Sequence, residues 1–171
     1  FYESNDVIAT ISKVTSDIVQ NVAPNTREIY VPHAVDHEIF KRYTPEEVIP
    51  FRAAFDEHHD SQGKLLFFWN NRNARRKQTG SLIHWFNDFL EIVGKDKAAL
   101  VMHTDPKDPH GQDLLHIINH IGLNTDRQVM ISTQKVPLDQ MSGFYNMADV
   151  TVNISDAEGF GLATLESLSC G

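Results

Sequence analysis

Three observations predict an α/β fold for this chain. A continuous apolar run at residues 64–69, KLLFFW, has the length of a strand that is covered on both faces. Other short apolar segments alternate with helical patterns of ten or more residues, which favours right-handed crossovers between parallel strands. Near the end of the chain, two glycines separate an alternating apolar segment from a helix-forming run. The sequence therefore predicts a Rossmann-like parallel sheet with helices on both faces.

The first part of the chain predicts a small unit followed by a longer helix. Residues 6–11 favour a short strand, and residues 12–22 favour a helix that begins at a serine of the helix-capping type. Residues 28–31 form a second short apolar segment. Residues 45–59 begin with proline and place their apolar side chains on one helical face, which predicts an amphipathic helix.

From residue 64 onwards, strands and helices are expected to alternate. The expected strands are 64–69, 98–102, 129–131 and 149–154, and the expected helices are about 80–93, 112–121 and 137–147, with a last helix near Gly161. Ligands of such a sheet bind beyond the carboxyl ends of the strands. The segments that follow these strand ends are 70–77, 103–108, 132–136 and 155–162. We expect the four segments to converge on one crevice.

Composition narrows the class of protein. With 171 residues, of which 41% are hydrophobic and 22% charged, the chain is long enough for one well-buried globular domain. Its formal net charge of −8 argues against nucleic acid as a partner. Cys170 is the only cysteine, so an intrachain disulfide is excluded and a reducing compartment is favoured. No apolar run reaches the length of a membrane span.

The glycine-containing segment near the end of the chain predicts an anion site. Gly159 and Gly161 precede a helix whose first turn offers unpaired N–H groups and the positive end of its dipole. Glu158 and Glu166 stand at either end of this segment, with seven residues between them. A phosphate group fits the glycine turn, and the two carboxylates suit contacts with two parts of an extended ligand.

A basic segment, NNRNARRKQ, directly follows the 64–69 strand. Four of the fifteen Lys and Arg residues fall within positions 72–77. Arg can grip phosphate oxygens with a fork of donors, whereas Lys supplies a compact charge. We expect Arg72 and Lys77 to contact an anion, and Arg75 and Arg76 to face water.

These motifs resemble glycosyltransferase family 4, whose members are retaining enzymes with the GT-B fold. The resemblance rests on EGFGL followed by TLESLSCG, and on PHAVDHEIF at residues 32–40. It implies that the chain is one half of a GT-B fold. Residues 1–36 would be the end of the acceptor domain with the interdomain connection. Residues 37–171 would be the donor domain, truncated at its C-terminus, and the N-terminal domain of the same protein would be missing.

The same resemblance implies roles for individual residues. Glu158 would contact the transferred sugar and Glu166 the ribose, while Arg72 and Lys77 would stabilise the departing diphosphate. The other residues implied in donor binding are Asn71, Thr104, Gln134, Val136, Gly159, Phe160, Gly161, Leu162 and Ala163. Asn71 stands where the family usually has glycine. His103, beside Thr104, is expected to be structural rather than catalytic.

The resemblance also implies which substrates and cofactors the protein uses. The donor substrate would be a nucleotide diphosphate sugar, the acceptor a glycan, lipid or protein, and no cofactor or metal would be required. The chain contains no Asp-x-Asp pair, which is the usual carboxylate clamp for Mg²⁺ or Mn²⁺ in other glycosyltransferases. We expect the protein in the cytoplasm, including the cytoplasmic face of a membrane.

Three alternatives remain open from the sequence. A dinucleotide-binding oxidoreductase would use GFGLAT as a G-x-G-x-x-G fingerprint, but Thr164 replaces the third glycine and the glutamates have no role. A nucleotide-sugar epimerase or a non-enzymatic binding module would share the architecture. A P-loop enzyme is excluded, since no G-K-[ST] follows a glycine loop.

Overall fold

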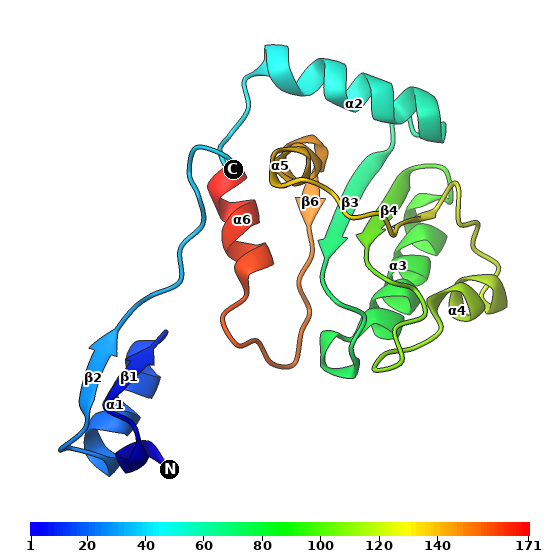
Figure 1. Ribbon diagram of the computed structural model, residues 1–171. Coiled ribbons are helices and arrows are strands. Elements are labelled where there is room, and N and C mark those ends of the chain that lie inside the picture. Colours follow the sequence, from blue (N-terminus) through cyan, green and yellow to red (C-terminus); the bar gives the residue numbers. More distant parts are fainter.

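The computed structural model describes residues 1–171 and contains two separate parallel sheets (Figure 1). The larger sheet has four strands in the order β5-β4-β3-β6. Its strands are β3 (Leu65–Asn70), β4 (Ala98–His103), β5 (Val129–Ser132) and β6 (Val150–Thr151). All three pairings are parallel, as the sequence predicts.

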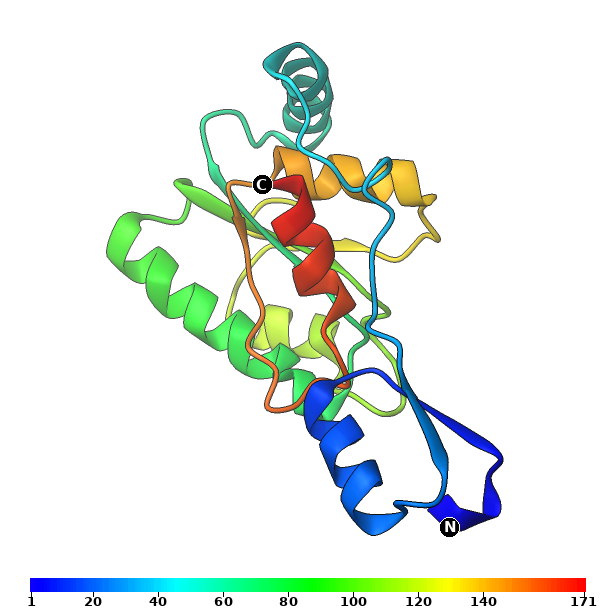
Figure 2. The same cartoon turned by 90° about the vertical axis from the view of Figure 1, so that its left-hand side faces the viewer.

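Helices cover both faces of this sheet, which confirms the predicted architecture (Figures 1 and 2). On one face, α3 (Thr79–Val93) and α4 (Leu114–His120) form a core with Trp69, Leu100 and Met102 of the strands. On the other face, α5 (Leu138–Met147) and α6 (Leu162–Cys170) pack with Leu66 and Phe68. Neighbouring residues of β3 thus enter opposite cores, because strand side chains alternate between faces.

The order of the strands creates a switch point at β3. From β3 the chain adds β4 and then β5 on one side, and it returns to place β6 on the other side. The segments that leave the carboxyl ends of β3 and β6 therefore start side by side, and the helices that follow them lie on opposite faces of the sheet. Crevices at such points are the usual ligand sites of open α/β sheets. The fold thus brings the basic segment and the glycine turn to one place.

The smaller sheet lies at the start of the chain. The 3₁₀ turn η1 (Tyr2–Ser4) is followed by β1 (Val7–Thr10), α1 (Lys13–Val22) and β2 (Arg27–Tyr30), and β1 pairs with β2 in parallel. Figures 1 and 2 show this unit apart from the larger sheet and joined to it by an extended segment. That segment leads to α2 (Pro45–His59), which lies against α5. The proposed division into residues 1–36 and 37–171 stays a prediction.

One element differs clearly from the prediction. The strand expected at 149–154 is only two residues long, although Val152 N–H still donates to the carbonyl oxygen of Phe68 at 2.8 Å. β6 is an edge strand with β3 as its single partner. The side chain of Asn153 then accepts from the N–H of Ser155 at 3.1 Å, which turns the chain away from the sheet. All other predicted elements begin and end within two residues of the observed ones.

Candidate functional site

The loops that leave β3 and β6 touch each other at the switch point. The N–H of Asp156 donates to the carbonyl oxygen of Arg76 at 2.8 Å, and the Arg76 guanidinium donates to the carbonyl oxygen of Ala157 at 2.9 Å. The predicted convergence of these two loops is therefore present in the fold. It also corrects the expectation that Arg76 simply faces water.

Lys77 and Glu158 form the centre of this junction. Lys77 lies in the short 3₁₀ turn η2 (Arg75–Lys77), and its side chain is only 6% exposed. Its ammonium group lies 2.5 and 2.6 Å from the two oxygens of Glu158, and it also donates to Asn71 Oδ1 at 2.7 Å. Burial alone would raise the pKa of Glu158, but the hydrogen bonds from Lys77 and Ser155 and the charge of Lys77 outweigh it and lower the pKa. Glu158 is thus held as a carboxylate.

Arg72 lies in the same loop but is engaged differently. Its side chain is 61% exposed, yet Nε and Nη2 donate to the two oxygens of Asp108 at 2.6 and 3.2 Å. Nη2 also lies 2.7 Å from His110 Nδ1. The hydrogen bonds from Arg72 and from the His110 N–H hold the pKa of Asp108 far below its usual range, and Asp108 raises the pKa of Arg72. Arg72 is therefore oriented by a carboxylate from the loop after β4.

The start of α6 offers free backbone donors. Gly161 is the N-cap residue and has φ 88°, a left-handed conformation that favours glycine. The first two helical N–H groups, those of Leu162 and Ala163, donate to no acceptor in the chain, and no side chain caps the helix. Unpaired donors of this kind are what the predicted anion site requires, and the site itself stays a prediction.

The residues just before this helix start are exposed. A Cβ added to Gly159 would meet no atom within 4 Å, so the turn is open on that side. The ring of Phe160 packs edge-on against His33, with the ring centroids 4.9 Å apart. His33 belongs to the extended segment that joins the two sheets, so this segment passes beside the glycine turn.

Glu166 faces inward, as predicted, but it already has a partner within the protein. The hydroxyl of Tyr145 donates to Glu166 Oε2 at 2.7 Å, and Asn70 Nδ2 donates to the same hydroxyl at 2.9 Å. Burial and the bond to Glu166 raise the pKa of Tyr145 far above its usual range, so the hydroxyl remains protonated. Glu166 Oε1 has no partner in the chain and is free to accept from a ligand.

The ends of β3, β4 and β5 are level with one another. Asn70 lies opposite His103, which lies opposite Ser132. His103 Nδ1 is 2.9 Å from Ser132 Oγ, and burial lowers the pKa of His103, which suits the expected structural role. Thr104, the next residue, is 7% exposed, and its hydroxyl has no hydrogen-bond partner.

Gln134 and Val136 lie beyond β5 and are set apart from the Lys77–Glu158 junction. With Phe55 and Phe144 they line a groove of about 440 Å³ between α2 and α5. Gln134 is exposed and Val136 is half-buried. Val136 packs against the core cluster that includes Tyr145, and no hydrogen bond joins either residue to Lys77 or Glu158.

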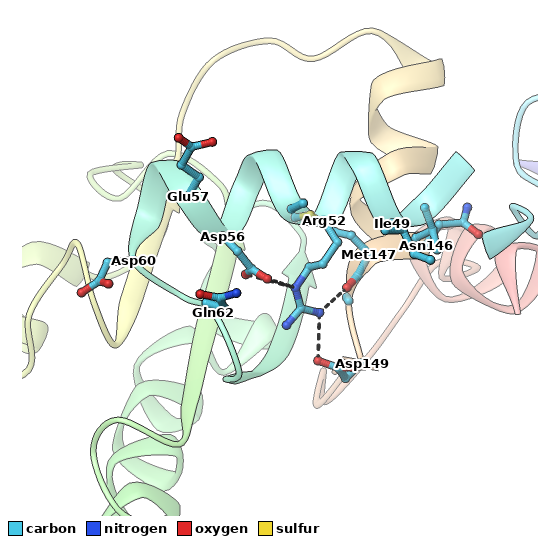
Figure 3. A pocket seen from close by; sticks show the side chains of 12 residues that line it. Ile49, Arg52, Asp56, Glu57, Asp60, Gln62, Asn146, Met147 and Asp149 are labelled. Carbon is cyan, nitrogen blue, oxygen red and sulfur yellow. Dashed lines mark hydrogen bonds and ion pairs between the residues drawn. The ribbon is translucent and has the colours of Figure 1, made fainter. Parts of the chain in front are cut away.

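The largest cavity of the molecule, about 610 Å³, lies elsewhere (Figure 3). It is under α2, near the beginnings of β3 and β6. There Arg52 donates to Asp56, to Asp149 and to the carbonyl oxygen of Met147, at 2.9 to 3.2 Å. Because Arg52 is held by these groups and by the carbonyl oxygen of Lys64 at 2.7 Å, we interpret its hydrogen bonds as structural, linking α2 to the beginnings of β3 and β6.

The sequence did not identify two residues that hold the site together. Asp108 belongs to a segment, DPKDPHG, whose position after a strand was noted, but nothing in it indicates a partner 36 residues away. Tyr145 lies on α5, where an aromatic residue at a buried helical position is typical of core packing. Its contact with Glu166 arises only because α5 and α6 pack side by side.

No three His, Cys, Asp or Glu side chains come together in an arrangement that would hold a metal ion. None of the helices is both long and apolar enough to cross a membrane.

Comparison with known proteins gives a match at the level of structure alone. No protein-family model and no curated protein matches the sequence. Among solved structures, sucrose-phosphate synthase from Thermosynechococcus elongatus is similar, with 20% identity over 99% of this chain and a TM-score of 0.72. Trehalose 6-phosphate synthase from Burkholderia multivorans has 12% identity over 99% of this chain and a TM-score of 0.74. HepE from Anabaena, solved with UDP and glucose, has 12% identity over 96% and a TM-score of 0.67.

These similarities show the fold. The chain spans only 40%, 43% and 42%, respectively, of the three matched chains. The neighbours are GT-B glycosyltransferases, and the chain has the architecture of one half of such a fold. Membership of glycosyltransferase family 4 stays a prediction.

Proposed function

We propose that this chain is the nucleotide-sugar-binding part of a glycosyltransferase that transfers a hexose to an acceptor with retention and without a metal ion. One observation carries the proposal. At the switch point of a parallel sheet, a buried Lys77 paired with Glu158, an exposed Arg72 and two free N–H groups at a helix start lie on adjoining loops. Such a set combines an anion site with a fixed carboxylate.

The diphosphate of the donor would lie against the positive side of this site. Arg72 and the N–H groups of Leu162 and Ala163 would stabilise the charge that develops on the leaving diphosphate. Gly159, Phe160 and Gly161 would line the turn. Lys77 already donates to Asn71 and Glu158, so its contact with phosphate requires an exchange of hydrogen bonds.

The two glutamates would recognise the other parts of the donor. Glu158, kept ionised by Lys77, would accept from hydroxyl groups of the transferred sugar. Glu166 would accept from the ribose through Oε1, while Tyr145 holds its other oxygen. Glycosidases also use paired carboxylates, but those flank one scissile bond. Glu158 precedes α6 and Glu166 lies within it, which suits an extended ligand better.

The nucleobase is the least defined part of the donor. We propose that Gln134 and Val136, with the buried hydroxyl of Thr104, contribute to the part of the site that binds the nucleobase. HepE and a trehalose-6-phosphate enzyme from E. coli, both similar in structure, were solved with UDP-sugars or UDP. UDP is therefore the first ligand to test. With a single buried cysteine, we propose a cytoplasmic protein.

Calorimetric titration of UDP, GDP and ADP in the presence of EDTA tests the proposal. We expect one of the three to bind, Arg72→Ala to weaken it, and Arg75→Ala to leave it unchanged, because the Arg75 side chain is exposed and, unlike that of Arg72, is not held by a carboxylate. NADH serves as the control for the oxidoreductase alternative, and an assay with donor alone detects an epimerase. Binding of NADH but of no nucleoside diphosphate would contradict the proposal. We expect the chain by itself to bind nucleotide without catalysing transfer.

A further inference from the structure

Arg72 is unusually well fixed for an exposed side chain. One edge of its guanidinium, formed by Nε and Nη2, is occupied by both oxygens of Asp108. Nη2 also meets His110 Nδ1 at 2.7 Å. The third nitrogen, Nη1, has no partner in the chain. The guanidinium therefore has one edge held by the protein and one nitrogen left for a ligand.

Asp108 is itself held in place. Its side chain is only 10% exposed, and Oδ1 accepts from the backbone N–H of His110 at 2.9 Å. The pKa of Asp108 lies far below its usual range, chiefly because of the bond from Arg72, so the carboxylate is ionised at any neutral or mildly acidic pH. A fixed, charged acceptor can orient a flexible cation that would otherwise lose rotamer entropy on binding.

The loop that carries Asp108 is attached to the basic loop by contacts that do not involve Asp108. Asn73 Nδ2 donates to the carbonyl oxygen of Gln112 at 2.7 Å, and the N–H of Gln112 donates back to Asn73 Oδ1 at 3.3 Å. The N–H of Arg75 donates to the carbonyl oxygen of His110 at 3.2 Å. A substitution at Asp108 should therefore leave the two loops together.

We propose that Asp108 is a positioning residue, which holds one edge of Arg72 so that Nη1 is presented to the diphosphate of a bound nucleotide. This inference rests on the proposed function, because it takes Arg72 as a ligand of the diphosphate. Asp108 does not itself touch the nucleotide. Its effect passes entirely through the orientation of the guanidinium.

A purely electrostatic effect of Asp108 on nucleotide affinity would have the opposite sign to a positioning effect. A carboxylate near an anion site repels a diphosphate, so its removal should strengthen binding. Positioning predicts that its removal weakens binding, because Arg72 then has to be ordered by the ligand. The sign of the change in affinity therefore separates the two effects.

The experiment is a calorimetric double-mutant cycle with UDP. We expect Asp108→Asn to weaken UDP binding about three- to tenfold in the protein with Arg72, because a neutral amide holds a guanidinium less firmly than a carboxylate does. In the Arg72→Ala background we expect the same substitution to leave affinity unchanged or to increase it. Asp105→Asn removes the same charge from the same loop without a contact to Arg72, and it should not weaken binding.

Each outcome has a defined meaning. If Asp108→Asn binds UDP as tightly as the unmodified protein, or more tightly, the carboxylate competes with the ligand and the proposal is wrong. An equal loss with and without Arg72 shows that Asp108 supports the loop instead, which also overturns it. If the unmodified protein binds no nucleoside diphosphate at all, it is the proposed function that fails.

Discussion

Replacing Lys77 by methionine should destabilise the protein substantially, because Glu158 would lose the ammonium group that satisfies both of its oxygens. Removing one partner of a buried ion pair costs about 3–5 kcal/mol. The loss is reduced because Arg76 Nη1 still lies 3.6 Å from Glu158 Oε2, and because the Glu158 side chain is 23% exposed and can regain some water, whereas that of Lys77 is only 6% exposed. We therefore expect a loss of about 2–3 kcal/mol in the free energy of unfolding. For a chain of this size that corresponds to a Tm lower by roughly 4–12 °C.

Thermal and urea unfolding, followed by tryptophan fluorescence, measure this loss. Trp69 is fully buried at the end of β3, next to the loop that carries Lys77, and it reports on the larger sheet. Lys95→Met is the matched control. Lys95 also forms an ion pair, with Glu91 at 3.1 Å, but its side chain is 49% exposed, so its removal should cost no more than about 0.5 kcal/mol.

The pH dependence gives a second measurement of the same pair. Because the folded pKa of Glu158 is lowered, the pair stabilises the fold at pH values above the unfolded pKa, and this contribution disappears as the pH falls through the folded value. The difference in stability between the unmodified protein and Lys77→Met should thus be largest at neutral pH and shrink below about pH 4.5, the ordinary pKa of a Glu carboxyl. A Tm for Lys77→Met equal to that of Lys95→Met at pH 7 would refute the reasoning.

Two further predictions concern neighbouring contacts. Tyr145→Phe removes the hydroxyl that fixes Glu166, so the preference for UDP over its 2′- and 3′-deoxy analogues, measured by calorimetry, should fall about threefold. If Glu166→Gln abolishes that preference while Tyr145→Phe leaves it unchanged, Tyr145 does not position the carboxylate. Gly111→Ala should cost about 1–3 kcal/mol in urea unfolding, since a Cβ would lie 2.3 Å from the backbone oxygen of Asn73. Gly159→Ala, where a Cβ meets nothing within 4 Å, is its control and should be neutral.

The fold followed closely from local patterns. The KLLFFW run was recognisable as a doubly covered strand because its residues enter both cores, so apolar side chains are needed on each face. The expected strand at 149–154 was too long for a related reason. The alternation of apolar residues continues beyond Thr151, the last residue of β6. Val152 and Ile154 pack against the core although they do not belong to a strand.

The candidate site was predictable in its location but less so in its contacts. Parallel strands end at one edge of a sheet, which sufficed to place the basic loop beside the glycine turn. The sequence could not show that Lys77 meets Glu158, because they lie 81 positions apart and either could have faced water. For the same reason, the sequence could not show that Asp108 holds Arg72. Contacts of this kind depend on the path of each loop after its strand.

The Lys77–Glu158 pair has a consequence for how a donor would enter the site. If Lys77 is to reach a phosphate, its ammonium group must give up a hydrogen bond to Glu158 or Asn71. The negative charge of the diphosphate then replaces that of the carboxylate, and Glu158 gains acceptor capacity for the sugar hydroxyls. Phosphate binding and sugar binding would therefore be coupled through one buried ammonium group. A nucleoside diphosphate without a sugar should release Glu158 from Lys77 and raise its pKa, which NMR titration of the Glu158 carboxyl can measure with and without UDP. An unchanged pKa would mean that Lys77 stays with Glu158, and that it either gives up Asn71 instead or does not contact the diphosphate.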